Sequence, residues 1–385
     1  MKPAERMSTI PPSSTLKVLA LAKELQRQGK DIVHMEVGEP DFDTPPHIKK
    51  AAVEAIERGA TKYTPSAGMP ELREAIAKNL AGKGIQTTPK NVIVTPGAKH
   101  AIFCAMATTL DPGDEIIIPC PCWTYEAIAL TFGAKPVYVE TKQADGFKLK
   151  EESLKAAITP KTKMILLNYP SNPTGAVMQK EDLKPIADLA VDRKLWVLSD
   201  EIYDCLVYEG KHASVMGLPG MAERTIYING FSKAYAMTGW RLGYAVAPVE
   251  IIAEMDKILQ ASTSCVAGFV QAAGVAALNG PQDCIEKMRK EYYKRRDVIV
   301  DGLNSIDGFE CAKPEGAFYA FPSIKKLSLP SLEFCERLLR DVGVAAVPGS
   351  GFGPYGEGHV RFSYATSMEN IGKGIERVKK VAEKI

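Results

Sequence analysis

Residues 229–244 read Asn229-Gly230-Phe231-Ser232-Lys233-Ala234-Tyr235-Ala236-Met237-Thr238-Gly239-Trp240-Arg241-Leu242-Gly243-Tyr244. Lys233 stands among small and apolar residues after a predicted strand, 225–229, and Arg241 follows eight residues later. Burial in such surroundings disfavours the ammonium form, so it lowers the pKa of a lysine. A neutral amine is what imine chemistry requires. Taken alone, a loop lysine that reaches solvent is the simpler interpretation, so the rest of the chain must decide.

The composition is that of an ordinary globular chain. It has 385 residues, 45% apolar and 24% charged, with a net charge of +2. This length favours two domains. Charges of both signs are mixed, so nothing indicates a nucleic-acid partner or an anionic membrane surface. The longest apolar runs, such as 115–119, are too short to span a bilayer. The first seven residues lack the apolar core of a signal peptide, and we predict a cytoplasmic protein.

Cysteine and histidine spacing gives no sign of a metal site. The eight cysteines are scattered, and the pair at 120 and 122 has CxC rather than CxxC spacing. Reduced thiols are therefore expected in a cytoplasmic protein. The five histidines form no HxxxH cluster. We expect no metal.

Strands and helices alternate between residues 91 and 200. The predicted strands are 91–95, 115–118, 136–139, 163–168 and 195–200, with helices ending near 110 and spanning 123–132 and 181–192. This alternation predicts an α/β fold, with three layers and a mostly parallel sheet covered on both faces. Ligands of such sheets bind at the carboxyl ends of the strands.

The pattern changes near residue 280, where a long charged helix, 281–303, opens an α+β region. We predict a large domain at 46–280 and a small C-terminal domain at 281–385. Residues 1–45 would form an N-terminal arm and part of the small domain. In that segment, residues 13–15 read as a helix cap, 16–28 as a helix and 32–37 as a short strand.

The turn 96–99, Pro96-Gly97-Ala98-Lys99, joins a predicted strand to a predicted helix. Free N–H groups and the helix dipole at such a place bind anions such as phosphate, although an ordinary turn has the same form. Lys99 would oppose the dipole of its own helix, which makes more sense if a second anion lies nearby.

Three side chains follow buried strands. Asn172 precedes a proline, and the Asn172–Pro173 bond is a candidate cis bond. Asp200 ends an apolar strand, where it either caps the next helix or pairs with a buried cation. Tyr203 lies three residues on, within reach of Asp200 if the segment is helical.

Two arginines and a tryptophan complete the candidates. Arg241 offers a fork suited to phosphate or carboxylate, and Arg361, inside an apolar strand, needs an anionic partner unless it lies on the surface. Trp123 is either a core residue or a flat stacking surface. Residues 351–356 fit GxGxxG but precede a strand rather than a helix, so we reject a dinucleotide site.

Together these residues describe a site for pyridoxal 5′-phosphate: a lysine for its aldehyde, an anion cradle, an aspartate for its ring nitrogen and an aromatic face. From about residue 13 to the C-terminus the chain also resembles the class I aminotransferases of fold type I, and within them the aspartate and prephenate aminotransferase branch. The matching stretches are 38–42 (GEPDF), 62–64 (KYT), 171–175 (SNPTG), 199–203 (SDEIY), 232–241 (SKAYAMTGWR) and 361–365 (RFSYA).

The resemblance implies a role for each residue. Lys233 would form the internal aldimine and shuttle a proton, Asp200 would keep the pyridine nitrogen protonated, and Asn172 and Tyr203 would bond the ring 3-oxygen. The remaining implied cofactor contacts are Trp123 on the ring and, at the phosphate, the backbone N–H groups of Ala98 and Lys99 together with Ser232 and Arg241. Tyr63 would reach the phosphate of a partner subunit, which implies a homodimer with shared sites. The implied substrate contacts are Gly38, Trp123, Asn172 and Arg361.

In relatives of this branch a lysine at the place of Lys99 recognises the distal carboxylate of the substrate, with help from the positions of Ser14 and Thr15. The resemblance therefore implies an L-aspartate/2-oxoglutarate aminotransferase. Alternatives are a prephenate or broad-specificity aromatic aminotransferase, a β-lyase or decarboxylase on the same scaffold, and a non-catalytic metabolite sensor. Cys122 stands where relatives of this branch often carry an aromatic residue before the tryptophan. The resemblance therefore does not define the shape of the pocket wall at this position.

Overall fold

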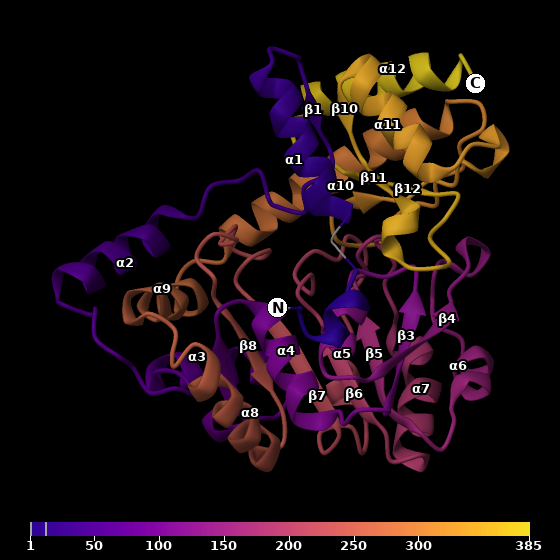
Figure 1. Ribbon diagram of the computed structural model, residues 1–385. Coiled ribbons are helices and arrows are strands. Elements are labelled where there is room, and N and C mark those ends of the chain that lie inside the picture. The colour runs from indigo at the N-terminus through magenta and orange to yellow at the C-terminus, as the bar shows by residue number, and fades with distance from the viewer. Residues whose placement is uncertain (1, 12–13) are drawn as a thin grey trace.

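The computed structural model describes residues 2–11 and 14–385, apart from the side chains of Ser14 and Thr15. Its largest element is a seven-stranded sheet (Figure 1). In spatial order the strands are β2 (Val92–Thr95), β8 (Gly243–Val246), β7 (Thr225–Gly230), β6 (Trp196–Asp200), β5 (Thr162–Asn168), β3 (Glu115–Cys120) and β4 (Lys135–Glu140). β8 is antiparallel to both neighbours, and the other pairs are parallel. The predicted α/β fold with a mostly parallel sheet is confirmed.

Helices cover both faces of this sheet because alternate residues of its strands point to opposite sides. In β6, Leu198 packs in a cluster with helices of one face, and Val197 packs in a cluster with helices of the other. The first face carries α4 (Ala98–Thr109), α5 (Glu126–Thr131) and α8 (Val249–Ser262). The second carries α6 (Glu151–Ala157) and α7 (Lys180–Asp192) over β3 and β5. The helices that pack with β2, β7 and β8 are α2 (Pro46–Glu57), α3 (Pro70–Gly82) and α9 (Gly268–Asn279). Strands buried on both sides need the continuous apolar runs seen in the sequence.

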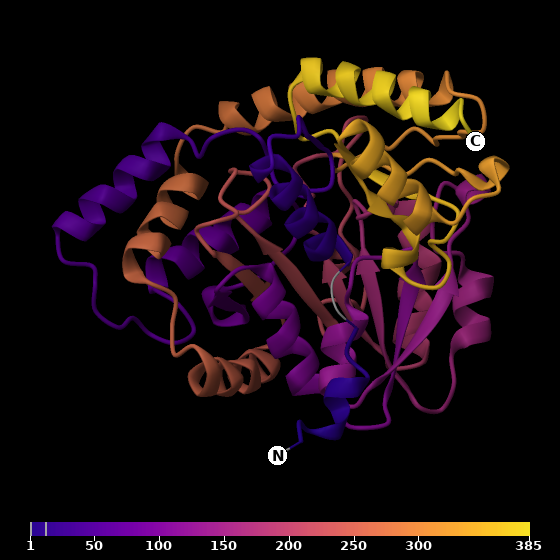
Figure 2. The same ribbon diagram turned by 45° about the horizontal axis from the view of Figure 1, so that its top comes forward.

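A second group of elements lies over the carboxyl edge of the large sheet (Figures 1 and 2). Its helices are α10 (Asp283–Asn304), α11 (Ser331–Val342) and α12 (Met368–Ala382), and its strands are β9 (Tyr319–Ala320), β10 (Val344–Ala345), β11 (Val347–Pro348) and β12 (Val360–Ser363). The N-terminal part joins this group, since β1 (Val33–His34) pairs with β10 and α1 (Ser14–Arg27) packs beside β10 and β11.

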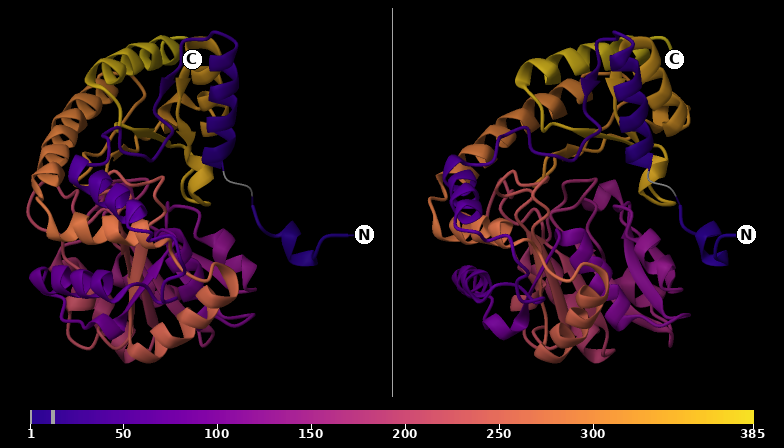
Figure 3. Two further views of the ribbon diagram at one scale, coloured as in Figure 1. Left: turned by 90° about the vertical axis from the view of Figure 1, so that its left-hand side faces the viewer. Right: turned by 60° about the vertical axis from the view of Figure 1, so that its left-hand side comes forward.

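Short 3-10 helices lie at Glu5–Ser8, Pro89–Asn91, Gln143–Asp145, Val215–Gly217, Lys325–Leu327 and Gly349–Phe352. The first projects with the N-terminal segment from the side of the molecule (Figure 3). None of the described helices is long and apolar enough to cross a membrane.

The structure departs from the predicted elements in several places. The helix expected at 123–132 begins only at Glu126, because the turn before it holds the hydroxyl of Tyr125 against Asp200. The strand expected at 32–37 spans only Val33–His34. The elements α6, β8, α8 and α9 had no counterpart in the prediction. The predicted cap residue Ser13 lies outside the described residues. The domain boundaries at 45/46 and 280/281 stay a prediction.

Substitution of Gly243 tests the close packing of β8 against the start of α4. A Cβ atom at this position would lie 2.3 Å from the backbone nitrogen of Ala98 and 2.5 Å from the carbonyl carbon of Gly97. Because backbone atoms cannot move aside cheaply, we expect Gly243→Ala to lower the free energy of unfolding by about 1–3 kcal/mol in urea titrations. The control is Gly372→Ala in α12, where the added atom meets open space. Equal stability of the two variants would contradict this packing.

Candidate active site

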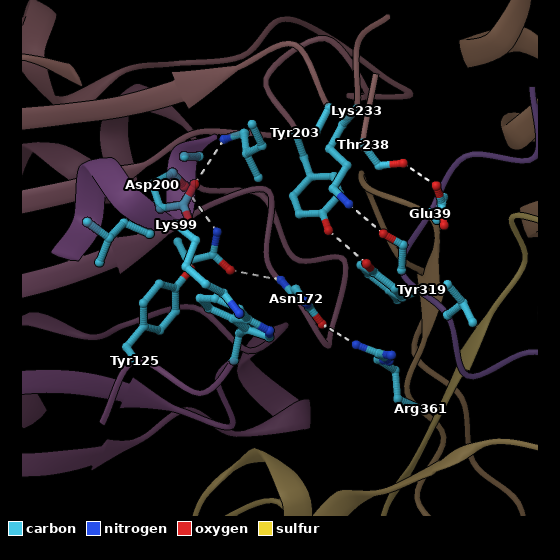
Figure 4. A pocket seen from close by; sticks show the side chains of 18 of the residues that line it. Glu39, Lys99, Tyr125, Asn172, Asp200, Tyr203, Lys233, Thr238, Tyr319 and Arg361 are labelled. Atoms are coloured by element: carbon cyan, nitrogen blue, oxygen red, sulfur yellow. Dashed lines mark hydrogen bonds between the residues drawn. The ribbon is translucent and has the colours of Figure 1, made fainter. Parts of the chain in front are cut away.

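A cavity of about 320 Å³ lies between the carboxyl edge of the large sheet and the group of elements above it (Figure 4). Its lining brings together most of the residues predicted from the sequence: Gly38, Ala98, Lys99, Trp123, Asn172, Asp200, Tyr203, Ser232, Lys233, Arg241 and Arg361. Lys233 and Arg241 come from the loop between β7 and β8, and Asp200 comes from the end of β6. Parallel strands therefore deliver these groups to one edge.

Lys233 projects into the middle of the cavity. Its Nζ atom donates a hydrogen bond to the carbonyl oxygen of Gly38 over 2.5 Å. Burial lowers the pKa of this lysine to about 8, although the negative charge of Glu39 partly offsets the effect. The neutral fraction of Lys233 near neutral pH is therefore much larger than that of an ordinary lysine, in the direction that the sequence predicts for an imine-forming amine.

Asp200 is the buried carboxylate of the site. Its Oδ2 atom accepts a hydrogen bond from the Tyr125 hydroxyl at 2.8 Å, and Oδ1 accepts one from the N–H of Ile202 at 3.2 Å. Burial raises its pKa to about 6, although these hydrogen bonds pull in the opposite direction. A cationic ligand group beside Asp200 would relieve this cost.

Arg361 is 2% exposed and lies within reach of Asn172. Its Nη1 atom donates to Asn172 Oδ1 at 2.9 Å, and Nη2 donates to the carbonyl oxygen of Glu36 at 2.5 Å. Its buried Nε atom has no hydrogen-bond partner among the described residues. A guanidinium remains charged even where burial lowers its pKa, so this fork is arranged for an anion. The predicted cis bond after Asn172 is confirmed.

Another part of the cavity lining, at Ala98 and Arg241 next to Gly97, presents groups that can bind an anion such as phosphate. α4 begins at Ala98, and its first N–H groups have no acceptor within the helix. Gly97 adopts φ 83°, and a Cβ atom there would lie 2.4 Å from Arg241 Nη2. Arg241 Nη1 donates to the carbonyl oxygen of Thr238 at 2.8 Å, and the Ser232 side chain lies nearby in the lining.

The charges of the cavity are not paired with one another. Within the described residues, Lys99, Lys233, Arg241 and Arg361 form no ion pair with a carboxylate at 4 Å or less. The Lys99 ammonium instead lies 4.5 Å from the ring centre of Trp123. Four cations face two carboxylates in the lining, those of Glu39 and Asp200, so the cavity favours ligands that carry several negative charges.

Three predicted residues are not brought into the cavity by the described structure. Tyr63 is 90% exposed and does not line it. The side chains of Ser14 and Thr15 lie outside the described part of the chain. Their predicted roles remain predictions.

Sequence reasoning missed three residues that the structure adds. Tyr125 bonds Asp200, Tyr319 bonds the Tyr203 hydroxyl at 2.7 Å, and Glu39 bonds the Thr238 hydroxyl beside Lys233. Tyr125 lies two residues after Trp123, and Glu39 belongs to the GEPDF stretch. Both are therefore next to residues that the sequence analysis identified. Nothing local to Tyr319 marks it.

The lining residues fit pyridoxal phosphate. An anion cradle stands at one end, a buried carboxylate suited to a cationic ring nitrogen stands at another, and an amine of lowered pKa lies in the cavity. A Cβ atom at Gly97 would fill part of this cradle. The fold and the site together define a pyridoxal-phosphate-dependent enzyme.

Comparison with known proteins gives the family. Residues 30–378 match the model of the family "Aminotransferase class I and II". The aspartate aminotransferase of Geobacillus stearothermophilus is 44% identical, with 100% of this chain and 99% of the relative covered. The aspartate/prephenate aminotransferase of Thermus thermophilus is 44% identical, with 98% of both covered. The solved structure of Thermus thermophilus aspartate aminotransferase with maleate superposes with a TM-score of 0.95 at 43% identity, covering 99% of this chain and 100% of that one.

The chain belongs to the class I and II aminotransferases. It is a pyridoxal-phosphate-dependent aminotransferase, as the resemblance in its sequence implies.

Asp200→Asn tests the cost of the buried carboxylate in the cofactor-free protein. Because the folded-state pKa is raised from 3.8 to about 6, the wild type keeps its full stability below about pH 4 and loses some as the pH rises through 6. The loss approaches about 3 kcal/mol, which the amide avoids. We expect the variant to be the more stable protein at pH 8 and similar at pH 4 in urea titrations.

The same variant loaded with cofactor should lose at least about 100-fold in amino transfer, since a charge aimed at the reacting system is removed. A stability difference that does not change between pH 4 and pH 8 would contradict the assignment of a destabilised carboxylate.

Proposed function

We propose that the enzyme transfers the amino group of L-aspartate to 2-oxoglutarate. The observation that carries this proposal is Lys99, a cation at the cavity that has no ion-pair partner among the described residues and lies over Trp123. Arg361 supplies a second unpaired cation from a different element, β12. Two separated cations favour a substrate with two carboxylates. The solved relative with maleate, a four-carbon dicarboxylate, supports the same substrate class.

Bound pyridoxal phosphate supplies an aldehyde for the amino group and a ring that withdraws electrons from the substrate α-carbon. We assign Lys233 as the residue that attaches the cofactor and then holds or delivers a proton on Nζ. Its lowered pKa suits both tasks, because a group that titrates near the working pH accepts and releases protons readily. The nearby Gly38 carbonyl orients the amine.

The remaining residues would hold the two ligands. Asp200 would face the ring nitrogen, with Tyr125 fixing its carboxylate. Asn172 and Tyr203 would donate to the ring 3-oxygen. Arg361 would bind the substrate α-carboxylate through both arms of its fork, the geometry that makes arginine–carboxylate pairs strong. The remaining proposed contacts are Trp123 at the ring face and, at the phosphate, the backbone N–H groups of Ala98 and Lys99 together with Ser232 and Arg241.

Prephenate, another 2-oxo acid with two carboxylates, is the second candidate acceptor. The printed name of the Thermus thermophilus relative includes this substrate. An aromatic amino donor has no distal carboxylate and would not need Lys99. The effect of replacing Lys99 therefore distinguishes an enzyme specific for aromatic substrates from one that acts on dicarboxylates such as aspartate or prephenate. A β-lyase or decarboxylase would release its product without any 2-oxo acid acceptor.

Lys99→Ala tests the substrate class. We expect kcat/KM for L-aspartate to fall about 10–100-fold, the effect of losing one charged hydrogen bond, while turnover of L-alanine stays within about twofold. The matched control is Lys78→Ala, an exposed lysine of α3 that does not line the cavity. Unchanged aspartate turnover in Lys99→Ala would sink the assignment.

We also propose a homodimer in which each subunit completes the site of the other. Tyr63 supports this, because its side chain is 90% exposed and therefore accessible to a second subunit. Its hydroxyl would donate a hydrogen bond to the phosphate that Arg241 and the start of α4 hold in the other subunit.

Tyr63→Phe should weaken cofactor binding about tenfold when pyridoxal phosphate is titrated into the cofactor-free protein, since one hydrogen bond to an anion is lost. Sedimentation should show a dimer for both wild type and variant. A monomeric wild type that binds the cofactor fully would contradict the proposal.

A cytoplasmic location completes the proposal. All eight cysteines are described, and all are free thiols. Free thiols in this number suit a reducing compartment.

A further inference from the structure

Tyr319 is a fully buried residue of β9 that reaches into the cavity (Figure 4). Its hydroxyl oxygen lies 2.7 Å from that of Tyr203, and the two rings meet edge to face at 5.8 Å between centroids. The Tyr319 ring also contacts Arg361, whose guanidinium carbon lies 4.6 Å from the ring centre. One side chain thus contacts both the proposed carboxylate clamp and a proposed cofactor ligand.

The hydroxyl of Tyr319 also lies tightly against Gly38. A Cβ atom at Gly38 would be 2.3 Å from this oxygen, so a side chain there would displace it. The carbonyl of Gly38 is the acceptor of Lys233. Tyr319 therefore also lies close to Lys233, because both side chains contact Gly38. The missing side chain of this glycine leaves room for the Tyr319 hydroxyl.

The direction of the Tyr203–Tyr319 hydrogen bond follows from the number of protons. Each phenol carries one proton, and burial raises the pKa of both, so both stay neutral. If Tyr203 points its proton at the 3-oxygen of the cofactor, as proposed above, it cannot donate to Tyr319. Tyr319 must then donate to Tyr203. A phenol that accepts a hydrogen bond becomes a stronger donor itself, because the two bonds polarise each other.

We propose that Tyr319 is a positioning residue, which aims the Tyr203 hydroxyl at the cofactor and supports Arg361 on the same ring. This inference rests on the proposed role of Tyr203. The strand pairing adds a consequence: β9 and β12 are neighbours, with Tyr319 opposite Ser363. This pairing keeps the Tyr319 ring beside Arg361, as the 4.6 Å contact shows.

The test is the visible absorbance of the cofactor-loaded enzyme as a function of pH, without substrate. Tyr319→Phe keeps the ring and removes the hydroxyl. The pH midpoint of the absorbance change should rise by roughly half a unit, the size expected when an ordinary hydrogen bond to one protonation state is weakened. In a Tyr203→Phe background the same substitution should shift the midpoint no further, because its effect acts through Tyr203.

Steady-state rates separate the two functions of the side chain. Tyr319→Phe should lower kcat severalfold with little change in KM, whereas Tyr319→Leu, which also removes the ring under Arg361, should raise KM for amino and 2-oxo acids. The matched control is Tyr227→Phe, a buried phenol whose hydroxyl accepts a hydrogen bond from Asn229 and which does not line the active-site cavity. Its midpoint and rates should equal those of the wild type.

Gly38→Ala gives a second route to the same state if Tyr319→Phe folds poorly. The added methyl should displace the Tyr319 hydroxyl and raise the midpoint, and Tyr319→Phe in that background should relieve the clash and recover stability. A Tyr319→Phe midpoint equal to that of wild type, or an undiminished shift without Tyr203, overturns the inference. A wild type with no cofactor absorbance would instead refute the proposed attachment at Lys233, so the two failures are distinguishable.

Discussion

Unpaired positive charge in one cavity is the constraint on which the site depends. Four cations line it without an ion-pair partner among the described residues, and one of them, Arg361, is almost fully buried. Burial of unpaired charge is costly, so the folded chain holds this arrangement at the expense of stability. Asp200 adds a second cost of the same kind. Negative ligand groups beside the cations and a positive one beside Asp200 would remove these costs together, which would favour a zwitterionic, phosphorylated ligand.

The buried strands of the sheet give the fold its stability, and the functional side chains lie at the ends of these strands and in the loops. Strands buried on both faces fix the ends of β6 and β7. Asp200 is the last residue of β6, and the loop that follows β7 carries Lys233. Arg361 and Tyr319 arrive from the elements above the sheet. The cavity therefore lies where two separately packed groups meet, and its polar side chains are held by hydrogen bonds such as that from Arg361 to Asn172.

Sequence reasoning reached the parts of the site that have a local signature. Lys233, Asp200 and Asn172 follow apolar strands, and parallel strands place their carboxyl ends at one edge. Tyr125 and Tyr319 have no such signature, because their partners lie 75 and 116 residues away. The antiparallel β8 was missed for a related reason: a four-residue strand that begins with glycine gives little alternation to read. Pairings set by contacts between distant segments must be seen in three dimensions.

The pairing of β1 with β10 has a consequence for biosynthesis. Val33 lies opposite Val344, so a strand made among the first residues waits for a partner that leaves the ribosome near the end of translation. Until then the first segment has an exposed edge and no sheet to join. Closing so long a loop costs only slightly more entropy than closing one half its length, but non-local contacts of this kind slow folding. The part of the cavity lined by Gly38 and Arg361 is therefore completed only after residues near the end of the chain have been made.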